Sequence, residues 1–504
     1  MSDRLPFQTI IGLEVHVQLR TSSKLFCGCS TQFGAPPNTN VCPVCLGLPG
    51  ALPVMNRAAI DLSIRAGLAL NCEISRHSKW DRKQYFYPDL PKGYQISQLD
   101  HPICGVGYLD IEDPHREGQT LRIGITRAHL EEDAGKSMHD ESAGTDQSRI
   151  DLNRCGTPLL EIVSEPDLRS ATAAKNYLTK LRLMMRHIDV SDCEMQEGSL
   201  RVDANVNLHI DTSTKSGIPD LTKTPIVEIK NMNSFRAVER AIEFEMDRQY
   251  DEWEETGATI ESTPKRTFGW DDIRERTFVQ REKELSADYR YFPDPDLLPV
   301  IVSEEQIAAA AASMGELPAD ALQRLQTQYG IKPYDADVIV SQGRDLVTYF
   351  ETMAKECGDG RRASSWVQQD VLRSMKDRHW SVDQLPVTAA IAGEILRRVV
   401  DGALDNTRAR DVFAHLIEHP PADPNPSPKS IVDAAADHLG IEEVDDSMMV
   451  TLCRELLAEN PSVVADVKGG KQQAVGSLIG KAKKKNPNVN PKQIRELCLQ
   501  LINE

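Results

Sequence analysis

The stretch IGLEVHVQL, residues 11–19, is the part of the chain that most directly indicates the fold. Aliphatic side chains at every odd position from Leu13 to Leu19 alternate with polar ones, which predicts a β-strand with one buried face. Glu14 and His16 are two residues apart on the other face, so a carboxylate and an imidazole lie side by side. One such stretch is most simply an amphipathic strand with a solvated face. Three later stretches repeat the design, which favours a sheet whose polar face carries out chemistry.

The three later stretches also place charged side chains among alternating aliphatic ones. LLEIV (residues 159–163) holds Glu161 in an otherwise apolar strand, where a carboxylate needs a cation, a metal or a hydrogen-bond donor. RVDANVN (residues 201–207) has Asp and Asn on its polar face, although both are depleted from ordinary strands. VEIK (residues 227–230) puts an acid and a base on one face. The charged members of these faces are Glu161, Arg201, Asp203, Glu228 and Lys230.

The segment TLRIGITRAHLEEDAGK, residues 120–136, adds a further acidic group. Its aliphatic residues alternate from Leu121 to Ile125, so we expect a strand that then runs into an acidic turn at residues 131–133. Glu132 of this turn joins the polar set. The complete set of candidate ligands is Glu14, His16, Glu132, Glu161, Asp203 and Glu228.

Oxygen-rich ligand sets with one imidazole suit Mg²⁺ or Mn²⁺, with substrate phosphates completing the coordination shell. The sequence contains neither a Walker A loop nor a GxGxxG motif, so a nucleotide is not held on a P-loop or a Rossmann helix. The residues therefore favour Mg²⁺-dependent phosphoryl transfer, with Arg201 and Lys230 available to neutralise charge. A purely structural Mg²⁺ or Ca²⁺ site is the alternative.

Four cysteines form a second candidate metal site. Cys27 and Cys29 are separated by one residue, and Cys42 and Cys45 follow as a CPVC motif. Two close cysteine pairs suit a tetrahedral Zn²⁺ site, and four sulfurs leave no position for water, so such a zinc is structural. The alternative, a redox CxxC motif, lacks the expected βαβ setting.

Length and charge limit the class of protein. The 504 residues exceed what one hydrophobic core normally serves, so we expect about three domains. The formal net charge is −18, but residues 468–504 carry eight basic residues and two Glu, or +6, which leaves −24 on the rest. A basic tail on an acidic body indicates local contact with a polyanion.

Targeting signals are absent from the printed sequence. The first ten residues lack the charged start and long apolar run of a signal peptide, and no stretch approaches the ~20 apolar residues that span a bilayer. Apart from the cluster of four, the eleven cysteines are scattered, which fits a reducing compartment better than a disulfide framework. We expect a cytoplasmic protein without membrane contact.

Beyond residue 303 the pattern is helical. The proline-rich stretch HPPADPNPSPK, residues 419–429, is the clearest linker in the chain. Behind it lies a small helical module in which six lysines surround an apolar stripe, namely Lys468, Lys471, Lys481, Lys483, Lys484 and Lys485. These lysines are either a solvated helix face or a surface that contacts nucleic-acid phosphates without reading bases.

Seven motifs follow one another along residues 12–297. They are GLEVHVQL (12–19), DRKQYFYPDLPKGYQISQ (81–98), EEDAGKSMHD (131–140), DLNRCGTPLLEIVSEPD (151–167), EGSLRVDANVN (197–207), IKNMNSF (229–235) and DYRYFPDPDL (288–297). In this order they resemble the B-subunit family of the bacterial aspartyl/glutamyl-tRNA amidotransferases. Motifs of this length and order are highly specific, and the match is dense over residues 8–300.

The resemblance implies an α+β fold in three parts. A glutamine synthetase/guanido-kinase-like cradle domain with a mixed sheet would span residues 1–297 and carry the catalytic residues. An all-helical domain would span residues 298–425, and a small helical, tRNA-binding tail domain residues 426–504.

The resemblance also implies the chemistry, that of an ATP-dependent carbon–nitrogen ligase. Misacylated Glu-tRNA(Gln) and/or Asp-tRNA(Asn) would be converted to Gln-tRNA(Gln) or Asn-tRNA(Asn): ATP phosphorylates the side-chain carboxylate, and ammonia displaces the phosphate. The ammonia would come from a glutaminase partner, because the chain contains no amidase signature of its own. The expected partners are misacylated tRNA, the amidase A subunit, which is the glutaminase, and the small C subunit. The expected cofactors are ATP, Mg²⁺ and structural Zn²⁺.

The resemblance places the family's metal ligands on Glu14, His16, Glu132, Glu161 and Asp203. That Glu228 and Lys230 line the same site is our own inference and not part of the family's metal set. The zinc would be dispensable to the reaction. Two other functions stay open: a non-catalytic tRNA-binding scaffold for the amidase, which would not need these side chains on strands, and a stand-alone small-molecule kinase, which would not need the basic tail.

Overall fold

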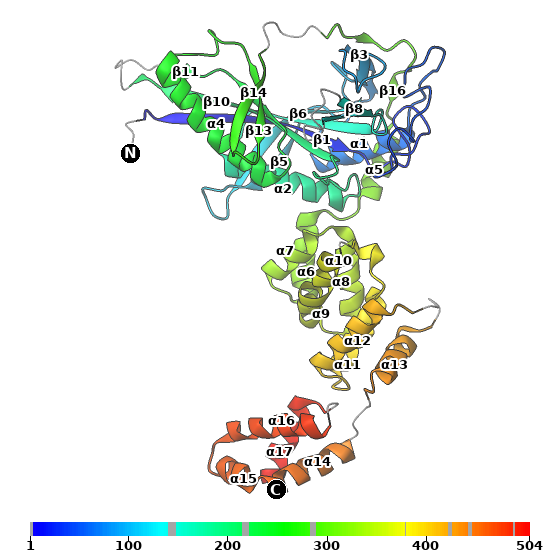
Figure 1. The fold of residues 1–504 in the computed structure, drawn as a ribbon, viewed down its shortest axis with the longest axis vertical. Helices are drawn as coiled ribbons and strands as arrows, with labels where there is room; N and C mark the ends of the chain where they lie inside the picture. The colour runs from blue at the N-terminus through cyan, green and yellow to red at the C-terminus, as the bar shows by residue number, and fades with distance from the viewer. Residues whose placement is uncertain are drawn as a thin grey trace. The chain divides into compact units, whose positions relative to one another are not determined.

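The computed structural model describes residues 4–139, 148–213, 221–282, 289–378, 380–421, 426–441, 446–486 and 489–503. Within them the chain forms two units, Met1–Leu317 and Pro318–Glu504. The first unit is built on a large sheet with helices, and the second is helical (Figure 1). The expected mixed α/β architecture with a helical C-terminal region is therefore confirmed.

The main sheet of the first unit has nine strands in the described residues. Its order is β14 (Arg276–Glu282), β13 (Arg266–Asp271), β12 (Val227–Lys230), β10 (Leu200–Asp211), β1 (Phe7–Gln18), β9 (Pro158–Ser164), β6 (Thr120–Glu132) and β5 (Gly107–Glu112), with β11 (Leu221–Lys223) beside β10. The pairs are antiparallel except β12 with β13, which is parallel. The sheet is therefore mixed.

Strand β1 lies between two of the three other strands that carry the polar motifs, β10 and β9. It pairs with β10 along almost its whole length and with β9 over Glu14–Gln18. Buried and half-buried residues alternate along it, as the sequence predicts, with the aliphatic side chains fully buried. The opposite, polar face of this central region carries the candidate site.

Helices cover the apolar face of the sheet. They are α1 (Arg57–Ala69), α2 (Ala171–His187) and α4 (Phe235–Thr256), whose buried residues share one hydrophobic core with the sheet. Side chains cap the N-termini of α1 and α2: that of Asn56 accepts a hydrogen bond from Ala58 N, and that of Ser170 from Ala173 N. A fourth helix, α5 (Glu304–Met314), contacts α1 and belongs to the same unit.

Three small sheets complete the first unit. They are β15 (Phe292–Pro293), β3 (Asp81–Gln84) and β4 (Tyr94–Ser97); β16 (Val300–Ile301) with β2 (His77–Ser78); and β7 (Lys136–His139) with β8 (Ser148–Asp151). The aromatic motif of residues 81–98 forms an antiparallel pair, β3 with β4, and β4 contacts β6.

The prediction of an acidic turn at residues 131–133 is wrong in one respect. Strand β6 does not end before the acidic residues but continues through Glu132, where it still pairs with Pro158 of β9. The pairing with β9 prolongs the strand beyond the last aliphatic alternation in its own sequence. Glu131 and Glu132 consequently point to opposite faces of the sheet.

The second unit holds two hydrophobic cores. The first is formed by α6 (Pro318–Tyr329), α7 (Pro333–Val340), α8 (Arg344–Cys357), α9 (Gly360–Trp366), the π-helix η2 (Val367–Val371), α10 (Leu372–Arg378), the 3₁₀-helix η3 (Val382–Gln384), α11 (Ala389–Val400), α12 (Asn406–Glu418) and α13 (Pro428–His438). The second is formed by α14 (Asp446–Glu459), α15 (Pro461–Lys468), η4 (Gln472–Val475), α16 (Gly476–Lys485) and α17 (Pro491–Asn503).

The predicted linker, residues 419–429, does not separate these two sets, because the helices before and after it, α12 and α13, both contribute to the first core. Residues 422–425 of it lie outside the described residues, and α13 already begins at Pro428. Among the helices that the structure describes, none combines the length and the apolar character that a membrane span requires.

Candidate active site and metal centres

Strand register brings most of the predicted ligands together on one face of the sheet. Glu14 is directly opposite Asp203 in the β1–β10 pair, and His16 is opposite Glu161 in the β1–β9 pair. Asn205 is opposite Glu228 in the β10–β12 pair. Residues far apart in the sequence thus line one surface, because directly paired residues point to the same side of a sheet.

The first acidic cluster consists of His16, Glu131 and Glu161. One ligand atom from each lies within 4.8 Å of the other two. His16 Nε2 lies 3.4 Å from Glu161 Oε2 and 3.7 Å from Glu131 Oε1. His129, paired with Glu161 across β6 and β9, adds a second imidazole whose Nε2 lies 3.5 Å from Glu161 Oε2.

The second acidic cluster consists of Glu14, Asp203 and Glu228, whose ligand atoms meet the same distance criterion. Glu14 Oε1 accepts a hydrogen bond of 2.9 Å from Asn205 Nδ2, and Glu228 Oε2 accepts one of 3.0 Å from Thr267 Oγ1. Lys230 forms an ion pair with Asp203. Lys230 is thus part of this cluster and provides its nearest positive charge.

The structure does not bring Glu132 into either cluster. Its carboxylate pairs with Lys92, also accepts a 3.1 Å hydrogen bond from Ile96 N, and is almost completely buried on the other side of β6. Glu131 stands beside His16 instead. Sequence reasoning missed Glu131 and His129, although both follow Arg127 at the two-residue step of a strand, which was the available signal.

Electrostatics in the first cluster follow from burial and close charges. Burial disfavours the charged form of His16, but hydrogen bonding to Glu161 and the charges of Glu161, Glu131 and Asp203 outweigh it and raise the pKa of His16 to about 9. Burial raises the pKa of Glu131, and the neighbouring Glu161 charge raises it further. Burial lowers the pKa of His129 to about 4.

The geometry and burial of this cluster fit a cation. Glu131 and Glu161 repel each other when both are ionised, and a divalent ion removes that repulsion. Glu131 Oε2 is also buried without a hydrogen-bond partner. An unpaired buried carboxylate oxygen that faces a second carboxylate and an imidazole fits a divalent cation with oxygen and nitrogen ligands.

Both clusters open into one cleft of about 640 Å³. Its lining includes five of the acidic and imidazole ligands together with the cations Lys83, Arg127, Lys230 and Lys265 and the phenols Tyr87, Tyr289 and Tyr291. A cleft that is lined by both carboxylates and cationic side chains can hold metal ions and anionic phosphates at the same time.

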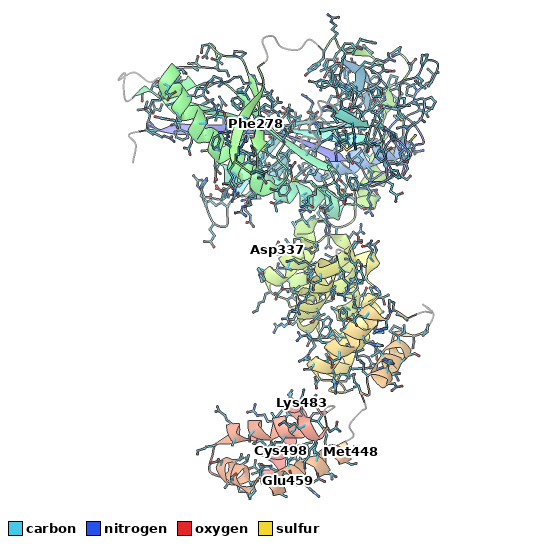
Figure 2. The ribbon with its side chains drawn as sticks, viewed as in Figure 1. Phe278, Asp337, Met448, Glu459, Lys483 and Cys498 are labelled. Atoms are coloured by element: carbon cyan, nitrogen blue, oxygen red, sulfur yellow. The ribbon has the colours of Figure 1, made fainter. Side chains whose placement is uncertain are left out.

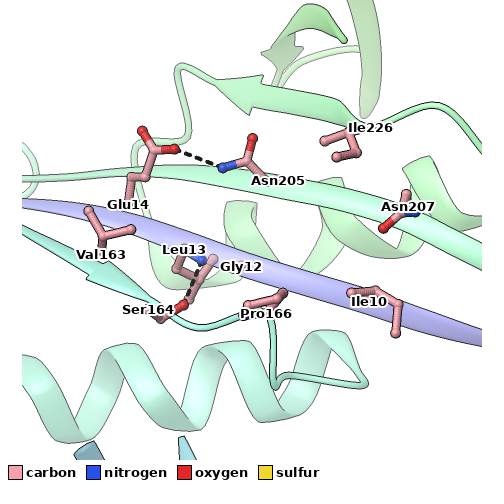
Figure 3. A pocket seen from close by; sticks show the side chains of 10 residues that line it. All are labelled: Ile10, Gly12, Leu13, Glu14, Val163, Ser164, Pro166, Asn205, Asn207 and Ile226. Carbon is pink, nitrogen blue, oxygen red and sulfur yellow. Dashed lines mark hydrogen bonds between the residues drawn. The ribbon is translucent and has the colours of Figure 1, made fainter. Parts of the chain in front are cut away.

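A smaller pocket of about 190 Å³ adjoins the cleft along β1 and shares Glu14 and Val163 with it (Figure 3). Its other lining residues are mostly apolar or carry amides. The hydrogen bonds from Asn205 to Glu14 and from Leu13 N to Ser164 Oγ hold its walls (Figure 3). The pocket extends the cleft by a largely uncharged compartment.

The four predicted zinc ligands come together as expected, so this part of the sequence can hold a structural metal. The Sγ atoms of Cys27, Cys29, Cys42 and Cys45 all lie within 4.8 Å of one another. Cys42 Sγ and Cys45 Sγ are 3.9 Å apart, close to the edge of about 3.8 Å that Zn–S bonds of ~2.3 Å give a tetrahedron. A hydrogen bond from the Cys27 thiol lowers the pKa of Cys45 to about 4. All eleven cysteines are free thiols.

The six tail lysines have different surroundings. Lys483 pairs with Asp405 at 3.1 Å, Lys485 with Glu459 at 2.7 Å and Lys471 with Asp466 at 3.3 Å. Lys481 donates to Asn460 Oδ1. Lys468 and Lys484 are exposed and form no ion pair with the described residues. Figure 2 marks Lys483 and Glu459, which lie on α16 and α14.

Comparison with known proteins covers nearly the whole chain. A family model described as the GatB/GatE catalytic domain matches residues 9–308, and one described as the GatB domain matches residues 348–502. An aspartyl/glutamyl-tRNA(Asn/Gln) amidotransferase B subunit from Rhodopirellula baltica is 63% identical over 499 residues, 99% of this chain and 97% of the relative. Proteins of the same name from Caldanaerobacter subterraneus subsp. tengcongensis and Chlorobaculum tepidum are 43% and 42% identical, over 98% of this chain and 99% of each relative.

Proposed function

The chain belongs to the family of aspartyl/glutamyl-tRNA(Asn/Gln) amidotransferase B subunits, and from this premise we propose that its cleft performs the ATP-dependent step of tRNA amidation. The substrate is tRNA misacylated with Glu or Asp. The observation that carries the proposal is the alignment of two acidic clusters, one on each side of β1, in one cation-lined cleft.

The reaction has two parts. A side-chain carboxylate oxygen of the charged amino acid attacks the γ-phosphorus of ATP, which forms an acyl phosphate and releases ADP. Ammonia then attacks the carbonyl carbon, the C–O bond to phosphate breaks, and amide and inorganic phosphate leave. Phosphorylation is needed because a carboxylate is a poor acyl donor, whereas an acyl phosphate has phosphate as a good leaving group.

The chain's own side chains bind and orient the reactants. Lys83, Arg127 and Lys265 line the cleft where phosphate oxygens would lie, and each favours the anionic form of a bound group. Lys230, held by Asp203, provides a fixed positive charge beside the second cluster. The strands keep these groups at set positions, which is the main contribution of a protein to phosphoryl transfer.

The metal ligands that we propose are His16, Glu131 and Glu161 in one cluster and Glu14, Asp203 and Glu228 in the other. When bound there, Mg²⁺ neutralises phosphate charge and holds the phosphates in line for transfer. Glu132 keeps a different role, since its pair with Lys92 fixes β6 against the turn that precedes β4. The four cysteines would hold a structural Zn²⁺ that takes no part in the reaction.

The finer architecture is also part of the proposal. The sheet and its covering helices would form the glutamine synthetase/guanido-kinase-like cradle, residues 298–425 a helical spacer and residues 426–504 the tRNA-binding tail. Ammonia would come from an amidase A subunit, in a complex completed by a small C subunit. Because its substrate is charged tRNA, such a complex would act in the cytoplasm.

The test is transamidation by the chain co-purified with its amidase partner. Formation of amidated tRNA that requires ATP and stops when Mg²⁺ is chelated would support the proposal. Binding of tRNA without such turnover would instead favour the non-catalytic scaffold, in which the carboxylates are structural.

A further inference from the structure

A lysine is completely buried next to the four-cysteine cluster. Lys24 follows β1, has no exposed surface, and its Nζ lies 3.7 Å from Cys45 Sγ. Lysine is seldom fully buried unless its charge is paired, because moving an ammonium group out of water is unfavourable. The buried ammonium group of Lys24 therefore needs a negatively charged partner.

The hydrogen bonds of Lys24 match an ammonium group. Besides Cys45 Sγ, Nζ lies 2.7 Å from the Asn40 carbonyl oxygen and 3.5 Å from the Leu152 carbonyl oxygen. Three N–H donors thus face three acceptors, two carbonyl oxygens and one sulfur. The carbonyl groups orient the ammonium but carry no net charge, so the thiolate is the group that compensates it.

The negative charge of the metal centre explains why an ammonium group lies beside it. Four thiolates around Zn²⁺ carry a net charge of −2, which is more negative than the single Cys45 thiolate that faces Lys24 in the empty cluster. A nearby ammonium therefore stabilises the metal-bound centre more than the empty one. Since Cys45 is itself buried, little solvent screens this interaction.

We propose that Lys24 is a positioning residue of the zinc centre, whose buried positive charge offsets the anionic zinc tetrathiolate and holds the Cys45 thiolate in place. This inference rests on the zinc occupancy proposed above. By hydrogen bonding to Asn40 and Leu152, Lys24 also joins the cysteine loop to the turn that follows Leu152.

That turn connects the centre to the acidic end of β6. Gly156 in it has a φ of +82°, and a Cβ there would lie 3.6 Å from both Cys45 Cβ and Lys24 Cδ. Gly156 N donates to Asp133 O at 2.8 Å, and Leu25 N donates to Gly156 O at 2.8 Å. The lysine, the turn and the end of β6 are thus in contact, and the positive φ of Gly156 favours glycine at this position.

The test uses the full chain with Co²⁺ in place of Zn²⁺, because Co²⁺ in four thiolates has intense sulfur-to-metal charge-transfer bands. Lys24→Met removes the charge and keeps the length, and Lys24→Arg keeps the charge. Lys175→Met, which changes an ion-paired lysine on α2, is the matched control. In Lys24→Met the band should move to longer wavelength and zinc loss to a chelator should accelerate about 10- to 100-fold.

Lys24→Arg and Lys175→Met should keep the wild-type band and remain within about threefold of the wild-type release rate. A Lys24→Met protein with wild-type band position and release rate would overturn the assignment. If Lys24→Met does not accumulate, expression in zinc-supplemented medium decides: rescue supports a role in metal retention, and failure of rescue contradicts it. Absence of a tetrathiolate Co²⁺ spectrum in the wild type would refute the zinc site itself, a separate outcome.

Discussion

His16 on β1 and Glu161 on β9 are paired in register, and His16 Nε2 lies 3.4 Å from Glu161 Oε2 on the polar face of the sheet. The pair is continued on one side by His129 and Glu131 of β6. On the other side Glu14 of β1 faces Asp203 of β10. The candidate site is therefore a row of side chains across β6, β9, β1 and β10, which Glu228 extends to β12.

Asp203→Ala should abolish amidation by at least about 100-fold while glutaminase activity of the complex and tRNA binding stay largely intact. The change removes a proposed ligand of the second cluster and the closer of the two carboxylates that pair with Lys230. Transamidation of misacylated tRNA is the measurement, with Asp110→Asn on the edge strand β5 as control. Wild-type turnover by Asp203→Ala would refute the metal assignment.

Glu131→Gln and Glu132→Gln should differ sharply, although the residues are neighbours. Glu131→Gln should raise the Mg²⁺ concentration needed for half-maximal activity by about tenfold or more, because it removes a proposed ligand. Glu132→Gln should instead lower the free energy of unfolding by about 3 kcal/mol, since it leaves the buried Lys92 uncompensated. Mg²⁺ titrations and denaturant unfolding of both variants distinguish the roles. The reverse pattern would restore Glu132 to the metal site.

Asp133→Asn should reveal a pH-dependent contribution to stability. Burial opposes ionisation of Asp133, but Arg201 and Arg154 outweigh it and hold its pKa below the ordinary value. A lowered folded-state pKa stabilises the folded protein above the unfolded pKa of about 3.9, and this contribution is lost as the pH falls through the folded value. The wild-type advantage in unfolding free energy should thus be constant above about pH 5 and shrink below about pH 4. An advantage that grows on acidification would contradict the sign.

Replacing Lys468 and Lys484 together by Gln should raise the KM for tRNA and weaken its salt dependence, with less effect on ATP hydrolysis. These two lysines are exposed, whereas Lys483 pairs with Asp405, so Lys483→Gln is the control with a smaller expected effect. Deleting residues 468–504 would also raise the KM, but it removes Leu478, Ile494 and Cys498 from the core of the tail. An unchanged KM in the double variant would argue against phosphate contact by this surface.

Cys42→Ser with Cys45→Ser should remove one bound zinc per chain and lower the melting temperature, while amidation per folded complex remains near that of the wild type. The four sulfurs leave no ligand position for water, so the metal supplies structure only. Metal analysis, thermal unfolding and transamidation at low temperature check the three parts. A loss of activity in a fully folded complex would show that the centre is needed for the reaction.

Much of this protein was determined by local patterns in the sequence. The alternation from Leu13 to Leu19 was sufficient to predict β1 and its polar face. The spacing of four cysteines predicted their cluster. These features depend on residues close together in the chain, and the ordered motifs were enough to identify the family.

Only the tertiary structure decided which acidic residue faces the site. Strand β6 ends where its pairing with β9 ends, and this pairing continues through Glu132. As successive residues of a strand point to opposite sides, that extension places Glu131 in the cluster and sends Glu132 to Lys92. Likewise, the sequence did not indicate that Lys24 is buried at the cysteines, because its partners Asn40 and Leu152 come from separate segments. Local periodicity sets the faces of a strand, but the distant segments that pair with it determine its length and its neighbours.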